Sequence, residues 1–167
     1  MSLLEIFGLC ALAAAWCLPG HYPPWHSFEQ QALAAIGACL LAAAAVREPR
    51  ARMPGLAWIA LATTAVPWLQ WSTGKIVYLQ DAAISSLYLA GFGLCIAAGA
   101  TLVQRNPSAF LDRLAVAIVA AGIVSVGLAL IQWLGLASSW MIANMPRGGR
   151  PFANLGQPNH LCTLLGM

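Results

Sequence analysis

Charged residues are scarce in this chain, and their scarcity excludes most functions of soluble proteins. Asp, Glu, Lys and Arg together make up 8% of the 167 residues, against about 25% in soluble domains. Apolar residues make up 60%. The net charge of +3 is small and spread over several loops, which argues against nucleic acid as a partner. The composition predicts a protein embedded in a lipid bilayer.

The signatures of several enzyme classes are also missing. The chain has no acidic cluster for Mg²⁺, no His/Cys set spaced for zinc, no phosphate-binding P-loop and no Gly-x-Ser-x-Gly motif. Its five cysteines include no Cys-x-x-Cys pair and lie in or at the ends of apolar blocks, so we expect them to be small buried hydrophobes. We expect neither a metal nor another cofactor, and any enzyme here would be metal-independent.

The apolar residues form five blocks that predict membrane spans. They are Leu3–Leu18, Ala32–Val46, Gly55–Trp71, Ala82–Val103 and Phe110–Trp133. A bilayer core needs about 20 helical residues, so the second block is expected to borrow the polar residues at 29–31. A sixth block runs from about 160 to 167. We predict an all-α fold, a polytopic transmembrane helix bundle with five spans and the start of a sixth. Residues 1–167 are expected to be the N-terminal transmembrane part of a longer protein.

The arginines predict the orientation of the spans. Loops 47–54 and 104–113 carry five arginines, namely Arg47, Arg50, Arg52, Arg105 and Arg113. The opposite side carries three basic residues, Lys75, Arg147 and Arg150. Because cytoplasmic loops are enriched in Lys and Arg, the N-terminus is placed in the cytoplasm. The loop at 134–160 then faces outward, which in a bacterium is the periplasm.

One outward loop has the residues of an anion-binding site. It reads Arg147-Gly-Gly-Arg-Pro-Phe-Ala-Asn-Leu-Gly-Gln-Pro-Asn-His160. Arginine forks suit phosphate oxygens, and the carboxamides of Asn154, Gln157 and Asn159 both donate and accept hydrogen bonds. Asn159 and His160 would lie near the N-terminus of the sixth helix, where anions are stabilised. The loop is therefore a candidate for holding a phosphate-bearing lipid that carries sugar. A capped loop whose arginines bind lipid headgroups is the alternative.

The segment Arg150-Pro-Phe-Ala-Asn-Leu-Gly-Gln-Pro-Asn-His160, placed after five spans, resembles the motif of bacterial protein O-oligosaccharyltransferases. These pilin-glycosylating ligases are related to O-antigen ligases and O-antigen polymerases. The loop His21-Tyr-Pro-Pro-Trp-His-Ser-Phe28 also resembles the N-terminal region of that protein-glycosylating branch. Together the two motifs and the spacing of the spans cover nearly the whole chain.

The resemblance implies a metal-independent glycosyltransferase of the bacterial inner membrane. Family members take a glycan from undecaprenyl diphosphate on the periplasmic side and move it en bloc to an acceptor, here a Ser or Thr hydroxyl of pilin or another exported protein. By this resemblance Arg150 and Gln157 have catalytic roles, Asn154 and Asn159 support them, and Arg147 is a weaker match. Lys75, from its charge, and His160, as part of the motif, complete the predicted substrate-binding set: Lys75, Arg147, Arg150, Asn154, Gln157, Asn159 and His160. The family's catalytic histidine lies in a downstream periplasmic loop, so this fragment alone is expected to be inactive.

Two alternatives belong beside this interpretation. The first is a related glycan enzyme, either an O-antigen ligase with a lipid A core acceptor or an O-antigen polymerase. The second is a non-catalytic membrane protein, such as a transporter subunit or a lipid-binding scaffold. Transporters more often carry polar residues within their spans, whereas here Ser125 is a mild exception in nearly apolar blocks, which argues against an ion pathway.

Overall fold

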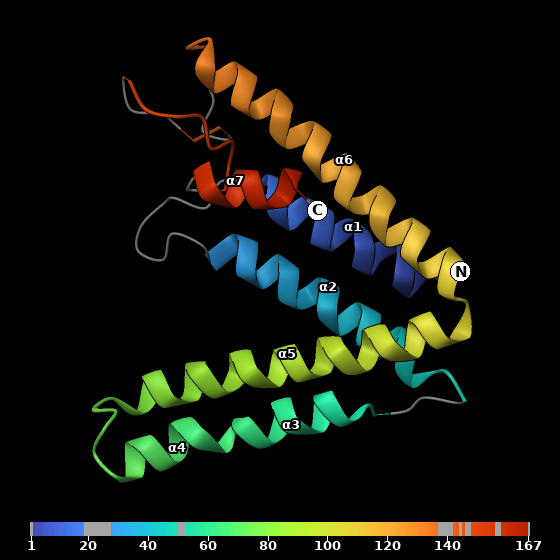
Figure 1. Ribbon diagram of the computed structural model, residues 1–167, viewed down its shortest axis with the longest axis vertical. Helices are drawn as coiled ribbons and strands as arrows, with labels where there is room; N and C mark the ends of the chain where they lie inside the picture. Colours follow the sequence, from blue (N-terminus) through green and yellow to red (C-terminus); the bar gives the residue numbers. More distant parts are fainter. Residues whose placement is uncertain are drawn as a thin grey trace. The chain divides into compact units, whose positions relative to one another are not determined.

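The structure is all-helical wherever it is described. The computed structural model describes residues 2–18, 28–49, 53–136, 142–143, 145, 148–155 and 158–166, without the side chains of 158–160. Its helices are α1 (Leu3–Cys17), α2 (Phe28–Val46), α3 (Gly55–Thr63), α4 (Ala65–Ser72), α5 (Leu79–Arg105), α6 (Pro107–Trp133) and α7 (Pro158–Leu165). Figure 1 shows their course along the chain. The predicted all-α class is confirmed.

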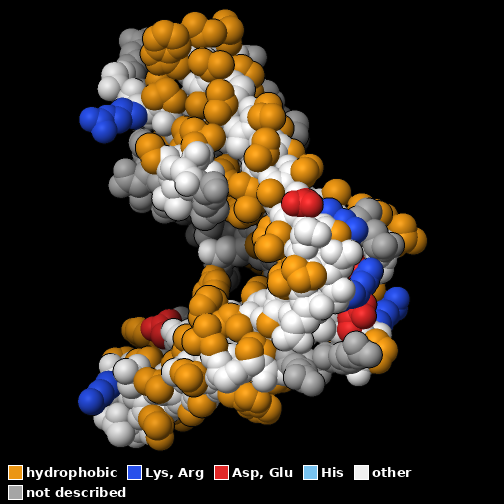
Figure 2. All heavy atoms as spheres, turned by 45° about the vertical axis from the view of Figure 1, so that its right-hand side comes forward, with side chains coloured by type: hydrophobic (Ala, Val, Ile, Leu, Met, Phe, Trp, Pro, Cys, Tyr) orange, Lys and Arg blue, Asp and Glu red, His pale blue; other side chains and the backbone are white. Residues whose placement is uncertain are grey.

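Three of the described helices, α2, α5 and α6, are long and apolar enough to cross a membrane. Helix α1 is equally apolar but shorter, at 15 residues. Hydrophobic side chains are spread widely over the face drawn in Figure 2, and charged ones appear there only in small groups. Helices suit this setting because a bilayer core offers no water to the backbone, so N–H and C=O groups must pair within the segment. The chain is part of a membrane protein, and the number of spans stays a prediction.

Helix boundaries follow local sequence signals. Helix α2 begins at Phe28 and takes in the polar residues at 29–31, as expected for the short second block. Ser2 and Glu5 cap α1 reciprocally: the Glu5 backbone N–H donates to the Ser2 hydroxyl at 3.3 Å, and the Ser2 backbone N–H donates to the Glu5 carboxylate at 3.4 Å. Asn106 ends α5, and its side-chain oxygen accepts the Ala109 N–H at 3.2 Å. Pro107 then occupies the first position of α6, where a missing N–H costs nothing.

The third apolar block, predicted as one continuous span, is interrupted at Thr64. Pro67 lies four residues after Thr63 and has no N–H to give to the Thr63 carbonyl, and its ring crowds that carbonyl. The Thr64 hydroxyl instead donates to the Leu61 carbonyl at 2.6 Å, and the Ser86 hydroxyl of α5 donates to the Thr64 carbonyl at 2.8 Å. The interruption is thus held by a neighbouring helix.

The chain divides into two compact units. The first unit comprises Ile6–Gly37 and Leu111–Met167, and it contains the loop of interest. Within it α1 and α2 approach closely: a Cβ added at Gly37 would lie 2.9 Å from the Gly8 carbonyl oxygen and 3.0 Å from Cγ of Leu12. Only glycine allows this separation of the two backbones.

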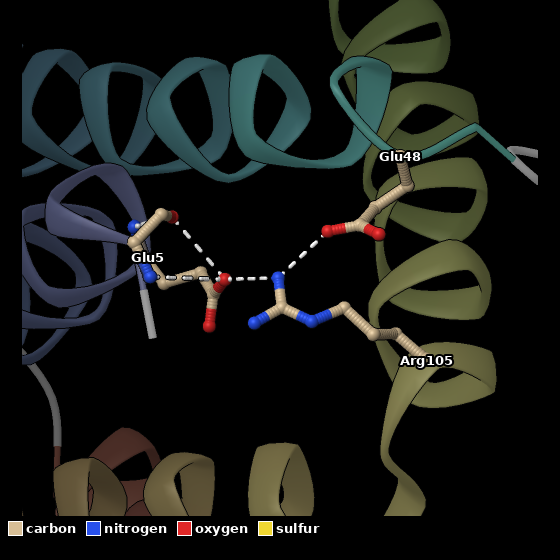
Figure 3. Close-up of polar contacts among 4 residues, drawn as sticks. Glu5, Glu48 and Arg105 are labelled. Atoms are coloured by element: carbon tan, nitrogen blue, oxygen red, sulfur yellow. Dashed lines mark hydrogen bonds and ion pairs between the residues drawn. The ribbon is translucent and has the colours of Figure 1, made fainter.

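The second unit comprises Ser2–Glu5 and Ala38–Phe110. Helices α3 and α4 both pack along α5 (Figure 1). A Cβ at Gly93 of α5 would lie 3.1 Å from the Leu61 side chain of α3. At one end of this unit Nη1 of Arg105 pairs with Glu5 at 2.9 Å and with Glu48 at 2.7 Å. Figure 3 shows the two carboxylates pointing toward the guanidinium, one from the start of α1 and one from the turn after α2.

The cysteines differ from expectation. All five are free thiols, and Cys10, Cys39, Cys95 and Cys162 are exposed on helix surfaces, while Cys17 is half-buried. The prediction that they are buried was wrong for those four. Helices that face lipid or further protein need not bury their small apolar residues against each other, so an apolar block does not by itself imply burial within these 167 residues.

Candidate functional site

Three carboxamides hold the loop that carries Arg150. They are Gln30 in the first turn of α2, Gln132 near the end of α6 and Asn154 in the loop itself, and we call them the carboxamide lock. All three lie in the first unit. Gln132 is 2% exposed and Asn154 is 1% exposed, so their hydrogen-bonding groups depend on protein partners rather than water.

Gln132 joins the end of α6 to two parts of the loop. Its Nε2 donates to the Ala143 carbonyl at 2.8 Å and also to the Ala153 carbonyl. Its Oε1 accepts the Phe152 N–H at 3.1 Å. Both amide hydrogens and the carbonyl oxygen are therefore used, and every bond goes to loop backbone.

Asn154 joins the loop to the end of α1. Its Nδ2 donates to the Cys17 carbonyl at 2.7 Å, and its Oδ1 accepts the Ala143 N–H at 3.0 Å. Cys17 is the last residue of α1, and the last carbonyls of a helix have no partner within it. Asn154 thus donates the hydrogen bond that the last carbonyl of α1 lacks, and the same bond ties the loop to α1.

Gln30 completes the lock from α2. Its Nε2 donates to the Leu18 carbonyl at 2.6 Å and to the Asn154 backbone carbonyl at 2.8 Å. One side chain therefore connects the residue after α1 with the loop. Between the two anchored residues Phe152 and Asn154, Ala153 has φ 53° and is fully buried, a left-handed conformation that costs a non-glycine residue about 1–2 kcal/mol.

The predicted ligand-binding residues stand in different places. Arg150 is exposed, two residues before Phe152 and beside the exposed glycines Gly148 and Gly149. Asn154 is buried, and its side chain holds backbone groups of α1 and of the loop. Its predicted contact with a ligand stays a prediction. Lys75 is exposed in the turn between α4 and α5 and belongs to the second unit.

Of the other predicted residues, the structure describes the backbone alone or nothing. Arg147 and Gln157 are not described, and for Asn159 and His160 only the backbone is described, in the first turn of α7. That helix begins at Pro158, close to the expected start of the sixth block. The roles of these four residues stay predictions.

Two members of the lock, Gln30 and Gln132, were missed as site residues. Gln132 is the last polar residue of a 27-residue apolar helix, and an isolated carboxamide near the end of a span is a signal for a buried partner. Gln30 stood out only as a residue that could lengthen the second block. For neither glutamine does the sequence indicate which loop its side chain would bind.

An apolar groove of about 350 Å³ lies on the first unit between α6 and α7. Its lining residues are all apolar: Ile118, Val119, Gly122, Ile123, Val126, Leu164 and Leu165. None of these side chains forms hydrogen bonds, so the groove suits hydrocarbon from lipid or from protein. Elsewhere on α6, the Ser125 hydroxyl is buried without a hydrogen-bond partner among the described residues.

Comparison with known proteins bears directly on this loop. The family model for protein glycosylation ligases matches residues 151–167, beginning immediately after Arg150. The chain is 30% identical over 167 residues to the general O-oligosaccharyltransferase of Acinetobacter baylyi, an alignment that covers 98% of this chain and 29% of that protein. The resemblance to protein O-oligosaccharyltransferases is confirmed. The chain spans about three tenths of the length of this relative. No solved structure matches the chain.

Proposed function

We propose that this chain forms part of a protein O-oligosaccharyltransferase, which moves a glycan en bloc from undecaprenyl diphosphate to a Ser or Thr hydroxyl of an exported protein such as pilin. The observation that carries the proposal is the similarity of nearly the whole chain to a general O-oligosaccharyltransferase. The match to the glycosylation-ligase model adds support, because it covers the part of the loop that the carboxamide lock holds.

The proposed location is the bacterial inner membrane, with the N-terminus in the cytoplasm and the loop of Arg150 in the periplasm. The pairing of Arg105 with Glu5 and Glu48 supports this orientation. It brings the start of α1, the turn after α2 and the end of α5 to the same end of the second unit, as alternating spans require. Arg47 follows α2 directly. The ion pairs of Arg105 therefore lie at the arginine-rich end of the spans, the end that is expected to face the cytoplasm.

The proposed reaction is an inverting transfer at the anomeric carbon of the first sugar. The acceptor oxygen forms a bond to that carbon, the bond from carbon to diphosphate oxygen breaks, and undecaprenyl diphosphate leaves. Arg150 is exposed and permanently charged, so it can offset the negative charge that grows on the leaving diphosphate. Arg147 and Lys75 would add to this charge, while Gln157 and Asn159 would orient the diphosphate or first sugar. A general base outside these residues, a histidine by family resemblance, would take the hydroxyl proton.

The test uses the whole protein in cells that make a lipid-linked glycan and a pilin acceptor. We expect Arg150→Ala to lower transfer by about 100-fold or more, the loss typical of removing one charge-stabilising donor, while the amount of protein in the membrane is unchanged. Arg47→Ala is the matched control, since Arg47 is an exposed arginine in the turn after α2, a loop predicted to face the cytoplasm, and it should transfer glycan normally. Normal pilin glycosylation by Arg150→Ala would refute the role of Arg150.

A further inference from the structure

The position of the exposed Arg150 depends on the residues that follow it in the chain. Arg150 is exposed, and Pro151 comes next. The proline ring fixes its own φ and restricts the residue before it to extended conformations. Phe152 follows and is anchored through its backbone N–H. The backbone of Arg150 is thus separated from the anchored Phe152 by one conformationally restricted residue, Pro151.

Gln132 anchors this segment. Its three hydrogen bonds go to backbone groups of the loop and so fix the loop in one conformation. One side chain binds the N–H of Phe152 and the carbonyl of Ala153, the residue with φ 53°. A buried residue in this sparsely populated region persists only where its surroundings fix it, and such residues cluster at ligand clamps. The carbonyl of Ala143 receives the second amide hydrogen of Gln132, so both ends of the described loop are held by one carboxamide.

From this geometry we infer that Gln132 is a positioning residue for the donor diphosphate: it holds the Arg150-Pro151-Phe152 segment in the conformation that presents the guanidinium. Gln132 makes no contact with the ligand and acts through Arg150. The inference rests on the proposed function, which gives Arg150 its role. It adds a residue outside the motif, on α6, to the determinants of donor binding.

The first arm of the test does not depend on activity. Hydrogen exchange is measured on the whole protein in detergent, in the backbone amides of residues 148–155. We expect Gln132→Met, which keeps the length of the side chain and removes its three hydrogen bonds, to speed exchange at Phe152 by at least tenfold. Gln104→Met is the matched control, because Gln104 is an exposed carboxamide at the end of α5, and it should leave exchange unchanged. Unchanged protection of Phe152 in Gln132→Met would overturn the inference.

The second arm measures transfer kinetics with purified lipid-linked glycan and acceptor. Gln132→Met should raise the KM for the donor about tenfold and leave the KM for the acceptor within twofold of the wild type. In an Arg150→Lys background, where the guanidinium is already gone, it should cause much less additional loss, because the two residues act as one unit. Independent losses that multiply, or a fall in folded protein with an unchanged donor KM, would mean that Gln132 has only a structural role.

The two arms separate the inference from the proposed function. A wild-type protein that transfers no glycan would refute the proposed function, while hydrogen exchange would still decide whether Gln132 holds the loop. A wild type that transfers glycan, together with a Gln132→Met variant of unaltered donor KM, would refute the positioning role alone.

Discussion

The close approach of α1 and α2 at Gly37 gives a sharp prediction about stability. A Cβ at this position would lie 2.9 Å from the backbone oxygen of Gly8 and 3.0–3.1 Å from two carbons of the Leu12 side chain. Leu12 can change rotamer, but the Gly8 carbonyl belongs to the backbone of α1 and moves only with the helix. Gly37→Ala must therefore push the two helices apart by a few tenths of an ångström.

The expected cost follows from two opposing effects. Inserting a methyl group into a well-packed contact costs about 1–3 kcal/mol. Replacing glycine by alanine within a helix returns about 0.5–1 kcal/mol, because the unfolded chain loses less conformational freedom. We expect Gly37→Ala to lower the free energy of unfolding by about 1 kcal/mol, the difference between the midpoints of these two ranges.

The assay is unfolding of the whole protein in detergent micelles by SDS, followed by circular dichroism. Gly127→Ala is the matched control, because Gly127 lies within α6 and no atom of the described residues lies within 4 Å of a Cβ built there. It should leave stability unchanged or raise it slightly. If Gly37→Ala unfolds like Gly127→Ala, the close contact between α1 and α2 does not exist as described.

Three further substitutions test the second unit by the same unfolding assay. Glu5→Gln should lower the free energy of unfolding by about 1–3 kcal/mol, and Glu48→Gln by less than about 1 kcal/mol. The losses differ because the Glu5 side chain is 3% exposed and the Glu48 side chain is 24% exposed. Equal losses would contradict a buried role for Glu5 beside Arg105. Ser86→Ala should cost about 0.5–1.5 kcal/mol through the lost bond to the Thr64 carbonyl, and a silent Ser86→Ala would show that α5 does not support the interruption between α3 and α4.

The sequence predicts the helices well where one physical signal dominates. Apolar blocks place every described helix, because backbone pairing within a bilayer allows few other structures. The Asn106-Pro107 pair marks the boundary between α5 and α6 for a local reason, a cap followed by a ring that suits the first turn. The interruption at Thr64 is harder to predict, since Pro67 is compatible with both a continuous and a broken membrane helix, and the Ser86 bond that holds it comes from another helix.

The site shows where sequence reasoning ends. Arg150 was recognisable from its charge and its neighbours, and it is exposed as a ligand-binding residue should be. Asn154 was recognisable as functional, but a carboxamide suits a sugar and a helix end equally well, and the structure shows it bonded to the Cys17 carbonyl. Gln132 acts on residues some twenty positions away through a loop whose path no periodicity encodes.

The most direct test of the central claim is the mass of an acceptor protein. Pilin is purified from cells that make the lipid-linked glycan, with and without the gene for the whole protein, and analysed by intact mass and by peptide mapping. The account predicts that pilin gains the mass of one complete glycan on a Ser or Thr only when the gene is present. Unmodified pilin, with the glycan instead on the lipid A core or in longer polymers, would contradict it.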